Sequence, residues 1–242
     1  MSSSPEPRQN RLLATLPDEE YENFLFNLEL VTLEFKKILY DVNQPIQYVY
    51  FPLYGVVSLV TIMEDGSIAE VGTVGNEGFV GLPVFLGAEQ IPGQAFAQVP
   101  GYAMRMDTKV FKDKVKSETV LFNMLQRYTQ ALFNQIAQSA ACNRLHTIEE
   151  RFCRWVLMTQ DRVQADQFPL TQEFLSQMLG VRRAAVNKVA TTIQKAGLIQ
   201  YQRGKMTILD REGIESSSCE CYGIIKAEFE RLLNNQKNVG QV

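Results

Sequence analysis

The chain has 242 residues and a mass of 27.5 kDa, enough for one large domain or two small ones. Its hydrophobic fraction of 45% and charged fraction of 21% exclude a mainly disordered chain, and its four cysteines are too few for a disulfide scaffold. The net charge of −3 is unevenly distributed, because residues 1–145 carry 11 basic and 16 acidic side chains whereas residues 146–242 carry 13 and 11.

The beginning of the chain carries no recognisable targeting signal. Residues 1–10 are polar and predict a tail, because no apolar run follows a basic region. The longest uncharged stretch is Val42–Met63, with 22 residues, but Pro45, Pro52 and Gly55 interrupt it and β-branched and aromatic residues dominate the rest. We interpret it as two short strands, and we expect a cytoplasmic protein without membrane contact.

The N-terminal half alternates strand-like runs with turns. After a predicted helix over Leu12–Leu28, strands are predicted at Val31–Leu39, Tyr48–Phe51, Val56–Met63, Ile68–Val74, Gln94–Val99 and Tyr102–Met106. The sequence Glu64-Asp65-Gly66 between two of these runs indicates a hairpin. So many short strands are typical of a β-sandwich or a small barrel. Glycines recur every third residue and are interpreted as turn glycines, at Gly72, Gly75, Gly78 and Gly81.

The middle of the chain predicts one long amphipathic helix. Neither proline nor glycine occurs from Asp107 to Arg144. A helix of about 25 residues is roughly 37 Å long, more than a small barrel can cover. We therefore predict a homodimer in which this helix packs against its own copy. The predicted interface residues are Phe122, Leu125, Thr129, Leu132 and Ile136.

The last third predicts a helix, a polar linker, two short helices, a hairpin and a final helix. Their ranges are Thr147–Arg162, Val163–Pro169, 172–179, 183–196, the strands Leu198–Tyr201 and Met206–Leu209, and Gly213–Leu233. Ser176 is small where two helices would cross, Gly180 permits a tight turn, and Val186 and Val189 follow as an inner face. This spacing is typical of a helix-turn-helix.

The chemistry of this segment favours nucleic acid. The 36 residues from Phe174 to Leu209 contain six basic residues and no acid, which would attract a polyanion. A recognition helix presents its first residues to base edges, where arginine pairs with guanine and asparagine with adenine. The predicted readers are Arg182, Arg183, Asn187 and Lys188, and the hairpin forms a wing whose Arg203 and Lys205 contact phosphates.

The chain from about Leu12 to Asp210 resembles the Crp/Fnr superfamily of bacterial transcription regulators. The resemblance rests on the glycine-rich β half, the long helix and the stretch LTQEFLSQMLGVRRAAVNKVATTIQKAGLIQYQRGKMTILD. It implies an α+β fold with a β-roll of the cyclic-nucleotide-binding type over 11–116, a dimerisation helix over 117–145 and a winged helix-turn-helix over 146–242. It also implies double-stranded DNA and a second copy as partners, with RNA polymerase expected, and a phosphate held by Thr171.

The sensor half lacks the residues that bind cyclic nucleotides in this family. A glutamate that holds the ribose and an arginine that neutralises the phosphate are replaced by Phe79 and Gly93. An apolar ring and a glycine cannot perform those roles. Cyclic AMP and cyclic GMP are therefore not expected as effectors, and the effector stays unknown. The candidate pocket residues are Phe79, Val80, Leu82, Gln94, Ala95 and Ile136.

The remaining polar chemistry is sparse. Cys142 and Cys153 fall on predicted helices, and His146, the only histidine, is interpreted as a hinge or cap residue. The pair Cys219 and Cys221 could bind metal or oxidise, but no histidine lies near it in the sequence, so no metal site and no cofactor are predicted.

The sequence contains no recognised catalytic motif, and we predict that the protein is not an enzyme. A Gly-x-Ser-x-Gly elbow, a phosphate-binding loop and a paired-histidine metal motif are all missing. The alternative to a DNA-binding regulator is a β-roll sensor or scaffold that acts on protein partners without binding DNA.

Overall fold

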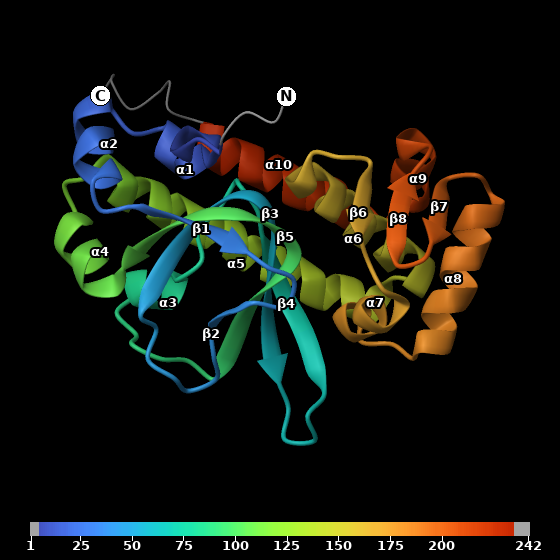
Figure 1. Ribbon diagram of the computed structural model, residues 1–242. Helices are drawn as coiled ribbons and strands as arrows, with labels where there is room; N and C mark the ends of the chain where they lie inside the picture. Colours follow the sequence, from blue (N-terminus) through green and yellow to red (C-terminus); the bar gives the residue numbers. More distant parts are fainter. Residues whose placement is uncertain (1–4, 235–242) are drawn as a thin grey trace.

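The computed structural model describes residues 5–234. The N-terminal part contains a short 3-10 helix (Pro7–Gln9), α1 (Arg11–Ala14), α2 (Asp18–Leu25), β1 (Glu29–Leu33), β2 (Ile38–Tyr40), β3 (Tyr48–Ile62), β4 (Ile68–Val74), α3 (Leu82–Phe85), β5 (Gly93–Asp107) and α4 (Thr108–Lys114). The rest contains α5 (Val120–Leu145), α6 (Ile148–Val163), β6 (Gln167–Pro169), α7 (Gln172–Leu179), α8 (Arg183–Lys195), β7 (Ile199–Gln202), β8 (Lys205–Ile208), α9 (Arg211–Ser217) and α10 (Cys221–Asn234). The predicted α+β architecture is confirmed (Figure 1).

The five N-terminal strands form one antiparallel sheet in the order β1-β5-β3-β4, with β2 also paired to β5. The strands β3 and β5 are each 15 residues long and pair along most of their length. The sequence predicted two short strands in place of each, because Pro52 and Gly55 look like breaks in the first and Pro100-Gly101 looks like a turn in the second. In β3 the structure absorbs Pro52 and Gly55 in irregular pairing between Pro52 and Val57, and the backbone at Gly55 has a φ of 93°.

The N-terminal segment differs from the prediction in two places. The helix predicted over Leu12–Leu28 is divided into α1 and α2, with Pro17 preceding the second. The predicted tail 1–10 is wrong for residues 7–10, while residues 1–4 lie outside the described residues. Asn10 is fully buried, and its amide donates to the carbonyls of Pro52 at 2.9 Å and Gly78 at 2.8 Å.

The long helix α5 confirms the prediction from the proline- and glycine-free stretch. The hydroxyl of Thr119 accepts from the backbone N–H of Phe122, and the Glu20 carboxylate accepts from the first two backbone N–H groups of the helix at 3.1 and 3.0 Å. The helix runs behind the sheet, and α10 packs along it (Figure 1). The chain therefore covers much of α5 with its own C-terminal helix.

This packing corrects the argument for the predicted dimer stripe. Leu125 is fully buried and Leu132 is 3% exposed within a single chain, so the premise that one chain cannot cover them is wrong. The other three predicted residues, Phe122, Thr129 and Ile136, are only partly buried. The spacing of these five residues correctly indicated a buried face. The sheet and α10, which are remote in sequence, cover that face in place of a second chain.

The C-terminal part contains a three-stranded sheet in the order β6-β8-β7, packed with α8, whereas α7 lies against α8 and against β4 of the first sheet. The strand β6 lies in the segment predicted as a linker, and it pairs with β8 from Gln167 to Pro169. The helix predicted over Gly213–Leu233 is two helices, α9 and α10, separated around Cys219. In the part of the chain that the structure describes, no helix combines the length and apolar character needed to cross a membrane.

Candidate nucleic-acid interface

The helix-turn-helix is built by local capping. The Thr171 hydroxyl accepts from the backbone N–H of Phe174 at 3.1 Å, which starts α7 at the next residue. Gly180 ends α7 with a φ of 63°, a left-handed conformation that glycine adopts without strain. The backbone N–H of Val181 then donates to the carbonyl of Ser176, and α8 begins at Arg183. The predicted turn is thus confirmed.

The second helix, α8, has one buried and one exposed face. Its buried side chains are Val186, Ala190 and Ile193, whereas Val189, predicted on the inner face, is partly buried. The four predicted readers, Arg182, Arg183, Asn187 and Lys188, are all exposed. Figure 1 shows α8 at the outer edge of the molecule.

Gln172 is a residue that the sequence reasoning missed. Its amide donates to Oδ1 of Asn187 at 3.0 Å, which fixes one end of the Asn187 side chain from the neighbouring helix. An asparagine that presents a defined orientation to a base loses less rotational freedom when it binds. No local spacing pairs Gln172 with Asn187, so only the packing of α7 against α8 reveals the contact.

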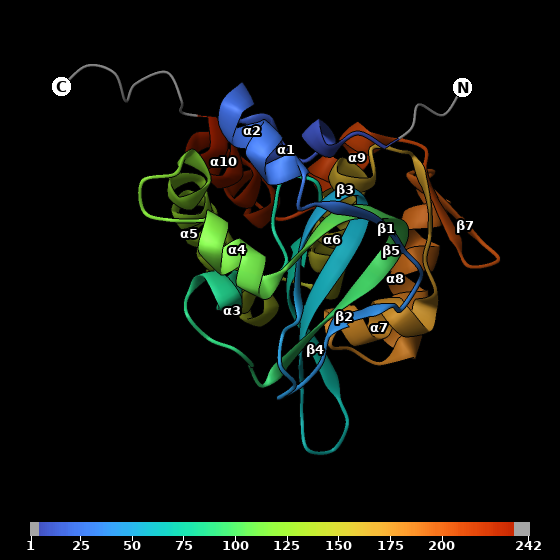
Figure 2. The same cartoon turned by 60° about the vertical axis from the view of Figure 1, so that its left-hand side comes forward.

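The predicted wing is a two-residue hairpin turn. Arg203 and Gly204 have φ angles of 51° and 74°, as a tight turn between twisted strands requires. The Tyr201 hydroxyl donates to the carbonyl of Leu170 at 3.0 Å, so the wing is anchored next to the start of α7. Arg203 and Lys205 are exposed, and the hairpin extends from the body of the protein (Figure 2).

The acid-free block therefore presents its charge outward. All six of its basic side chains are exposed, at Arg182, Arg183, Lys188, Lys195, Arg203 and Lys205. A surface of one sign attracts a polyanion and raises its local concentration. The exposed Thr171 lies beside the wing turn, because a Cβ added to Gly204 would be 3.9 Å from its methyl group. The arrangement brings the seven predicted DNA-binding residues onto α7, α8 and the wing.

The β-roll contains an apolar cavity of about 410 Å³. Four of the predicted pocket residues line it, namely Phe79, Leu82, Gln94 and Ile136. The other two do not: Val80 exchanges backbone hydrogen bonds with Tyr50, and Ala95 is buried in the sheet. None of the described residues that line the cavity is charged.

The side chains at this cavity offer few hydrogen-bonding groups to a ligand. The Gln94 amide donates to Asp41 at 2.7 Å and is thus already engaged. Phe79 is 1% exposed and stacks on Phe111 with ring centroids 5.1 Å apart. The cavity can accommodate an apolar molecule and offers no counter-charge for an anion.

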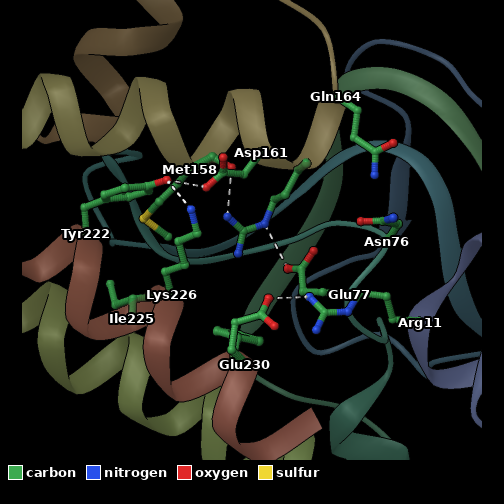
Figure 3. A pocket seen from close by; sticks show the side chains of 12 residues that line it. Arg11, Asn76, Glu77, Met158, Asp161, Gln164, Tyr222, Ile225, Lys226 and Glu230 are labelled. Carbon is green, nitrogen blue, oxygen red and sulfur yellow. Dashed lines mark hydrogen bonds and ion pairs between the residues drawn. The ribbon is translucent and has the colours of Figure 1, made fainter. Parts of the chain in front are cut away.

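A second cavity, of about 200 Å³, lies between α6 and α10, close to the sheet (Figure 3). The Arg162 guanidinium donates to the Glu77 carboxylate at 2.9 Å, and both residues are 7% exposed. The same guanidinium also donates to the carbonyl of Met158 and to the Gln135 side chain, so it joins α5, α6 and the segment after β4.

No local pattern in the sequence predicts this junction. Gly75 leaves space for Arg162, since an added Cβ would lie 2.5 Å from its Cγ, and Gly78 leaves space for Tyr128 in the same way. These two glycines therefore permit close approach of helices. Gly75 and Gly78 are also turn glycines as predicted, because the backbone N–H of Gly78 donates to the carbonyl of Gly75 at 3.0 Å. Among the four regularly spaced glycines, Gly81 alone has a positive φ, of 122°.

The cysteines are distributed differently from the prediction. Cys142, His146, Cys219 and Cys221 lie together, with all four potential ligand atoms within 4.8 Å of one another. The premise that no histidine is near the Cys219–Cys221 pair is thus wrong, because α10 folds back beside the end of α5. Cys153 lies apart in α6, and burial raises its pKa to about 12, so it stays a neutral thiol.

Comparisons with known proteins agree with this geometry. A cyclic nucleotide-binding domain model matches residues 30–118, and a Crp-like helix-turn-helix domain model matches residues 150–217. No curated protein sequence matches the chain.

Solved structures share the fold at low sequence identity. FixK2 from Bradyrhizobium japonicum has a TM-score of 0.66 at 14% identity, covering 79% of this chain and 98% of its own. A putative Crp/Fnr-family regulator from Eubacterium rectale has a TM-score of 0.66 at 16% identity, covering 85% and 96%. TTHB099, a CRP-family regulator from Thermus thermophilus, has a TM-score of 0.66 at 16% identity, covering 78% and 96%.

The two domain models match in the order in which a β-roll and a helix-turn-helix occur along this chain, and the first two of these solved structures align over 79% and 85% of it, more than either part alone. The α8 face carries the charge and the exposed polar groups that such a domain needs. The chain therefore belongs to the Crp/Fnr family of DNA-binding transcription regulators.

Proposed function

We propose that the protein binds a two-fold symmetric operator as a homodimer, reads bases with α8 and contacts phosphates with the wing. One observation carries this proposal: Arg182, Arg183, Asn187 and Lys188 form an exposed row at the start of α8 within an acid-free segment. Arginine and asparagine at this position suit guanine and adenine edges in the major groove. Thr171, as the exposed cap of α7, would hold a neighbouring phosphate.

The proposed dimer interface differs from the stripe predicted by the sequence. Residues that are exposed or partly buried recur along α5 at alternating intervals of four and three: Phe122, Gln126, Thr129, Phe133, Ile136 and Ala140. This spacing is that of a coiled-coil seam. Phe133 is 65% exposed in the single chain, so it gains most from a second copy. Leu125 and Leu132 belong to the core instead.

Two-fold symmetry would place two copies of α8 about 34 Å apart, which suits half-sites separated by one turn of DNA. The division into a sensor over 11–116, a dimerisation helix over 117–145 and a DNA-binding part over 146–242 belongs to this proposal. RNA polymerase is a further proposed partner, since transcription regulators act on it.

The proposed effector is neutral or largely apolar, and cyclic nucleotides are not proposed as effectors. Burying a cyclic phosphate without a counter-charge costs several kcal/mol. Gly93 and Gln94 supply no charge at the cavity, and Arg105 is paired with Glu29 at 2.8 Å on the sheet. Calorimetry with cyclic AMP and cyclic GMP tests this point, and a dissociation constant below about 10 μM would contradict it.

Selection of DNA sequences by the purified protein, followed by fluorescence anisotropy at several salt concentrations, tests the main proposal. We expect a palindromic consensus and an affinity that falls steeply with salt, because phosphate contacts release counterions. Phe133→Glu should leave the fold intact and convert the dimer to a monomer in light scattering. Phe26→Glu, at a phenylalanine outside α5 that is 90% exposed, should leave the dimer unchanged. A monomeric wild type at micromolar concentration, or equal affinity for all sequences, would overturn the proposal.

A further inference from the structure

Four side chains that can bind metal meet at the junction between the long helix and the C-terminal helix. Cys142 lies in the last turn of α5, and His146 is the residue that caps this helix. Cys219 precedes α10 and Cys221 is its first residue. About seventy residues of chain, which include the whole helix-turn-helix, separate the two pairs in sequence.

The potential ligand atoms face one another at short range. The Sγ atoms of Cys142 and Cys219 are 3.5 Å apart, and Sγ of Cys221 is 3.5 Å from Nδ1 of His146. All four atoms lie within 4.8 Å of one another. The three cysteines are at most 5% exposed and form a small cluster of their own, apart from the main hydrophobic core. Packing of the main core therefore does not account for their convergence.

We propose that Cys142, His146, Cys219 and Cys221 bind one zinc ion in a tetrahedral site. Zinc–sulfur bonds of about 2.3 Å and a zinc–nitrogen bond of about 2.0 Å separate tetrahedral ligand atoms by roughly 3.5–3.8 Å. The observed distances lie between 3.5 and 4.8 Å, so small side-chain rotations suffice. Three thiolates and one imidazole fill all four positions, which makes the site structural and leaves no open position for a substrate.

The surroundings of the cluster match those of a zinc site. His146 uses Nδ1 toward the thiols, while its Nε2 lies 3.2 Å from the Glu220 carboxylate. A carboxylate on the second ring nitrogen fixes the ring and raises the basicity of the liganding nitrogen. The Gln138 amide donates to Sγ of Cys221 at 3.1 Å. These contacts orient two of the four ligands before any ion binds.

Nearby cations balance the charge of the site. Three thiolates and a divalent ion leave one net negative charge, which is costly to bury alone. The guanidinium of Arg154 interacts electrostatically with Cys142, and that of Arg151 interacts with both Cys142 and Cys219. Both arginines lie on α6 and are at least nine-tenths buried. Their positive charges can therefore offset the net negative charge of the site.

Two other chemistries fit less well. A Cys142–Cys219 disulfide would use two of the four groups. It would not explain why His146 and Cys221 lie beside them. An iron–sulfur cluster places several iron and sulfide ions between its ligands and so requires them farther apart than a single ion does. The spread of at most 4.8 Å therefore favours one ion.

The site would fix the hinge of the molecule. It joins the last turn of α5 to the first turn of α10, and α6 of the DNA-binding part begins two residues after His146. Because the unfolded chain has no preformed site, the binding free energy would add to the stability of this junction. The inference stands independently of the proposed operator and effector.

Metal analysis of the full-length chain, purified without a histidine tag under reducing conditions, is the first experiment. We expect about one equivalent of zinc per chain, and after replacement by cobalt the visible absorption of a tetrahedral thiolate site. Cys142→Ser and Cys219→Ser should each lose most of the metal. Cys153→Ala, at a buried cysteine outside the cluster, should retain it.

A variant at the exposed Glu220 guards against misfolding of the cysteine variants. Glu220→Gln should weaken zinc affinity by about 10- to 100-fold in competition with a chromophoric chelator. Glu212→Gln, at an exposed acid on α9, should leave the affinity unchanged. Wild-type protein that binds neither zinc nor cobalt, that carries a Cys142–Cys219 disulfide in place of metal, or that contains iron with sulfide would overturn the proposal.

Discussion

The two functional regions of this molecule have opposite chemistry. The β-roll cavity is apolar and uncharged, whereas the face of α8 and the wing carries six exposed basic residues and no acid. A neutral apolar ligand in the cavity would carry no charge, so it would exert no direct Coulomb force on a charged polymer at α8. Under the proposed function, coupling between the regions would therefore pass through contacts that join them.

Two of the contacts that join the regions are polar, and a third is aromatic. Arg162 of α6 contacts Glu77 after β4, and Trp155 of α6 donates to Glu70 of β4 at 2.9 Å. The helix α7 also packs on the sheet, where Phe174 lies 6.0 Å from Phe35 between ring centroids. A buried polar contact has a defined geometry and is costly to break, so it transmits a displacement better than a flexible apolar surface does.

The largest expected effect follows from breaking the Arg162–Glu77 pair. Glu77→Gln removes one charge and leaves Arg162 buried without its counter-ion, which should lower the free energy of unfolding by about 3–5 kcal/mol. Chemical denaturation monitored by circular dichroism measures this change. The matched variant Glu89→Gln, at an exposed acid of the same half, should shift it by less than about 0.5 kcal/mol. Equal stabilities for the two variants would show that the pair does not hold the halves together.

The second effect concerns the charged region alone. Arg183→Ala should weaken binding to the selected operator by about 1–3 kcal/mol and relax the preference at one base pair, because a bidentate contact to a base edge is lost. Binding to random DNA should change far less. Anisotropy titrations on the operator and on single-base variants provide the measurement. A loss of equal size on every sequence would mean that Arg183 contacts phosphate instead.

These regions also differ in how far the sequence predicts them. Thr171, Gly180 and Arg183 lie within thirteen residues of one another, so capping, turn and exposed face follow from local spacing. The cluster of Cys142 with Cys219 and the contact of Arg162 with Gly75 depend on segments that meet only after folding. Local periodicity carries no information about such partners.

The long helix shows the same limit in a different form. Its hydrophobic period correctly predicted a helix with a buried face. The period did not say whether that face meets a second chain or the same chain, and Leu125 and Leu132 meet the same chain. The exposed fraction of each side chain, such as that of Phe133, distinguishes a face covered by the same chain from one left for a second chain. That fraction can be obtained only from a three-dimensional structure.

A third effect tests the joining contacts through pH. Burial raises the pKa of Glu70 to about 7, although hydrogen bonds from Ser58 and Trp155 and the charges of Arg154 and Arg162 oppose the shift. The folded state thus holds a proton that the unfolded state, with a pKa near its ordinary value, releases. Stability from this group is complete below about pH 4.5 and is lost as the pH rises toward 7.

The Glu70 carboxylate is enclosed by Ser58 and Trp155, while the residue as a whole keeps part of its surface exposed. We therefore expect only a modest fall in melting temperature between pH 5 and pH 8, roughly 2–4 °C, which corresponds to about 1 kcal/mol for a chain of this size. Glu70→Gln cannot release a proton and should remove most of this dependence. Glu64→Gln, at an exposed position of the β3–β4 hairpin, should preserve it. Thermal scans at a series of pH values distinguish the two, and identical slopes would refute the assignment.

The smallest effect lies at the wing, where affinity rather than sequence preference is at stake. Lys205 is exposed beside a rigid two-residue turn that Tyr201 anchors to the start of α7. We therefore expect its ammonium group to contact a phosphate and not a base edge. Lys205→Ala should weaken operator and random DNA alike and reduce the slope of log affinity against log salt by about one, since one fewer counterion is released. Lys114→Ala makes the same change in net charge on an exposed lysine of α4, outside the block. If the wing acts by contact, only Lys205→Ala changes the slope. If both variants change it equally, the overall field of the protein attracts DNA and the wing has no specific role.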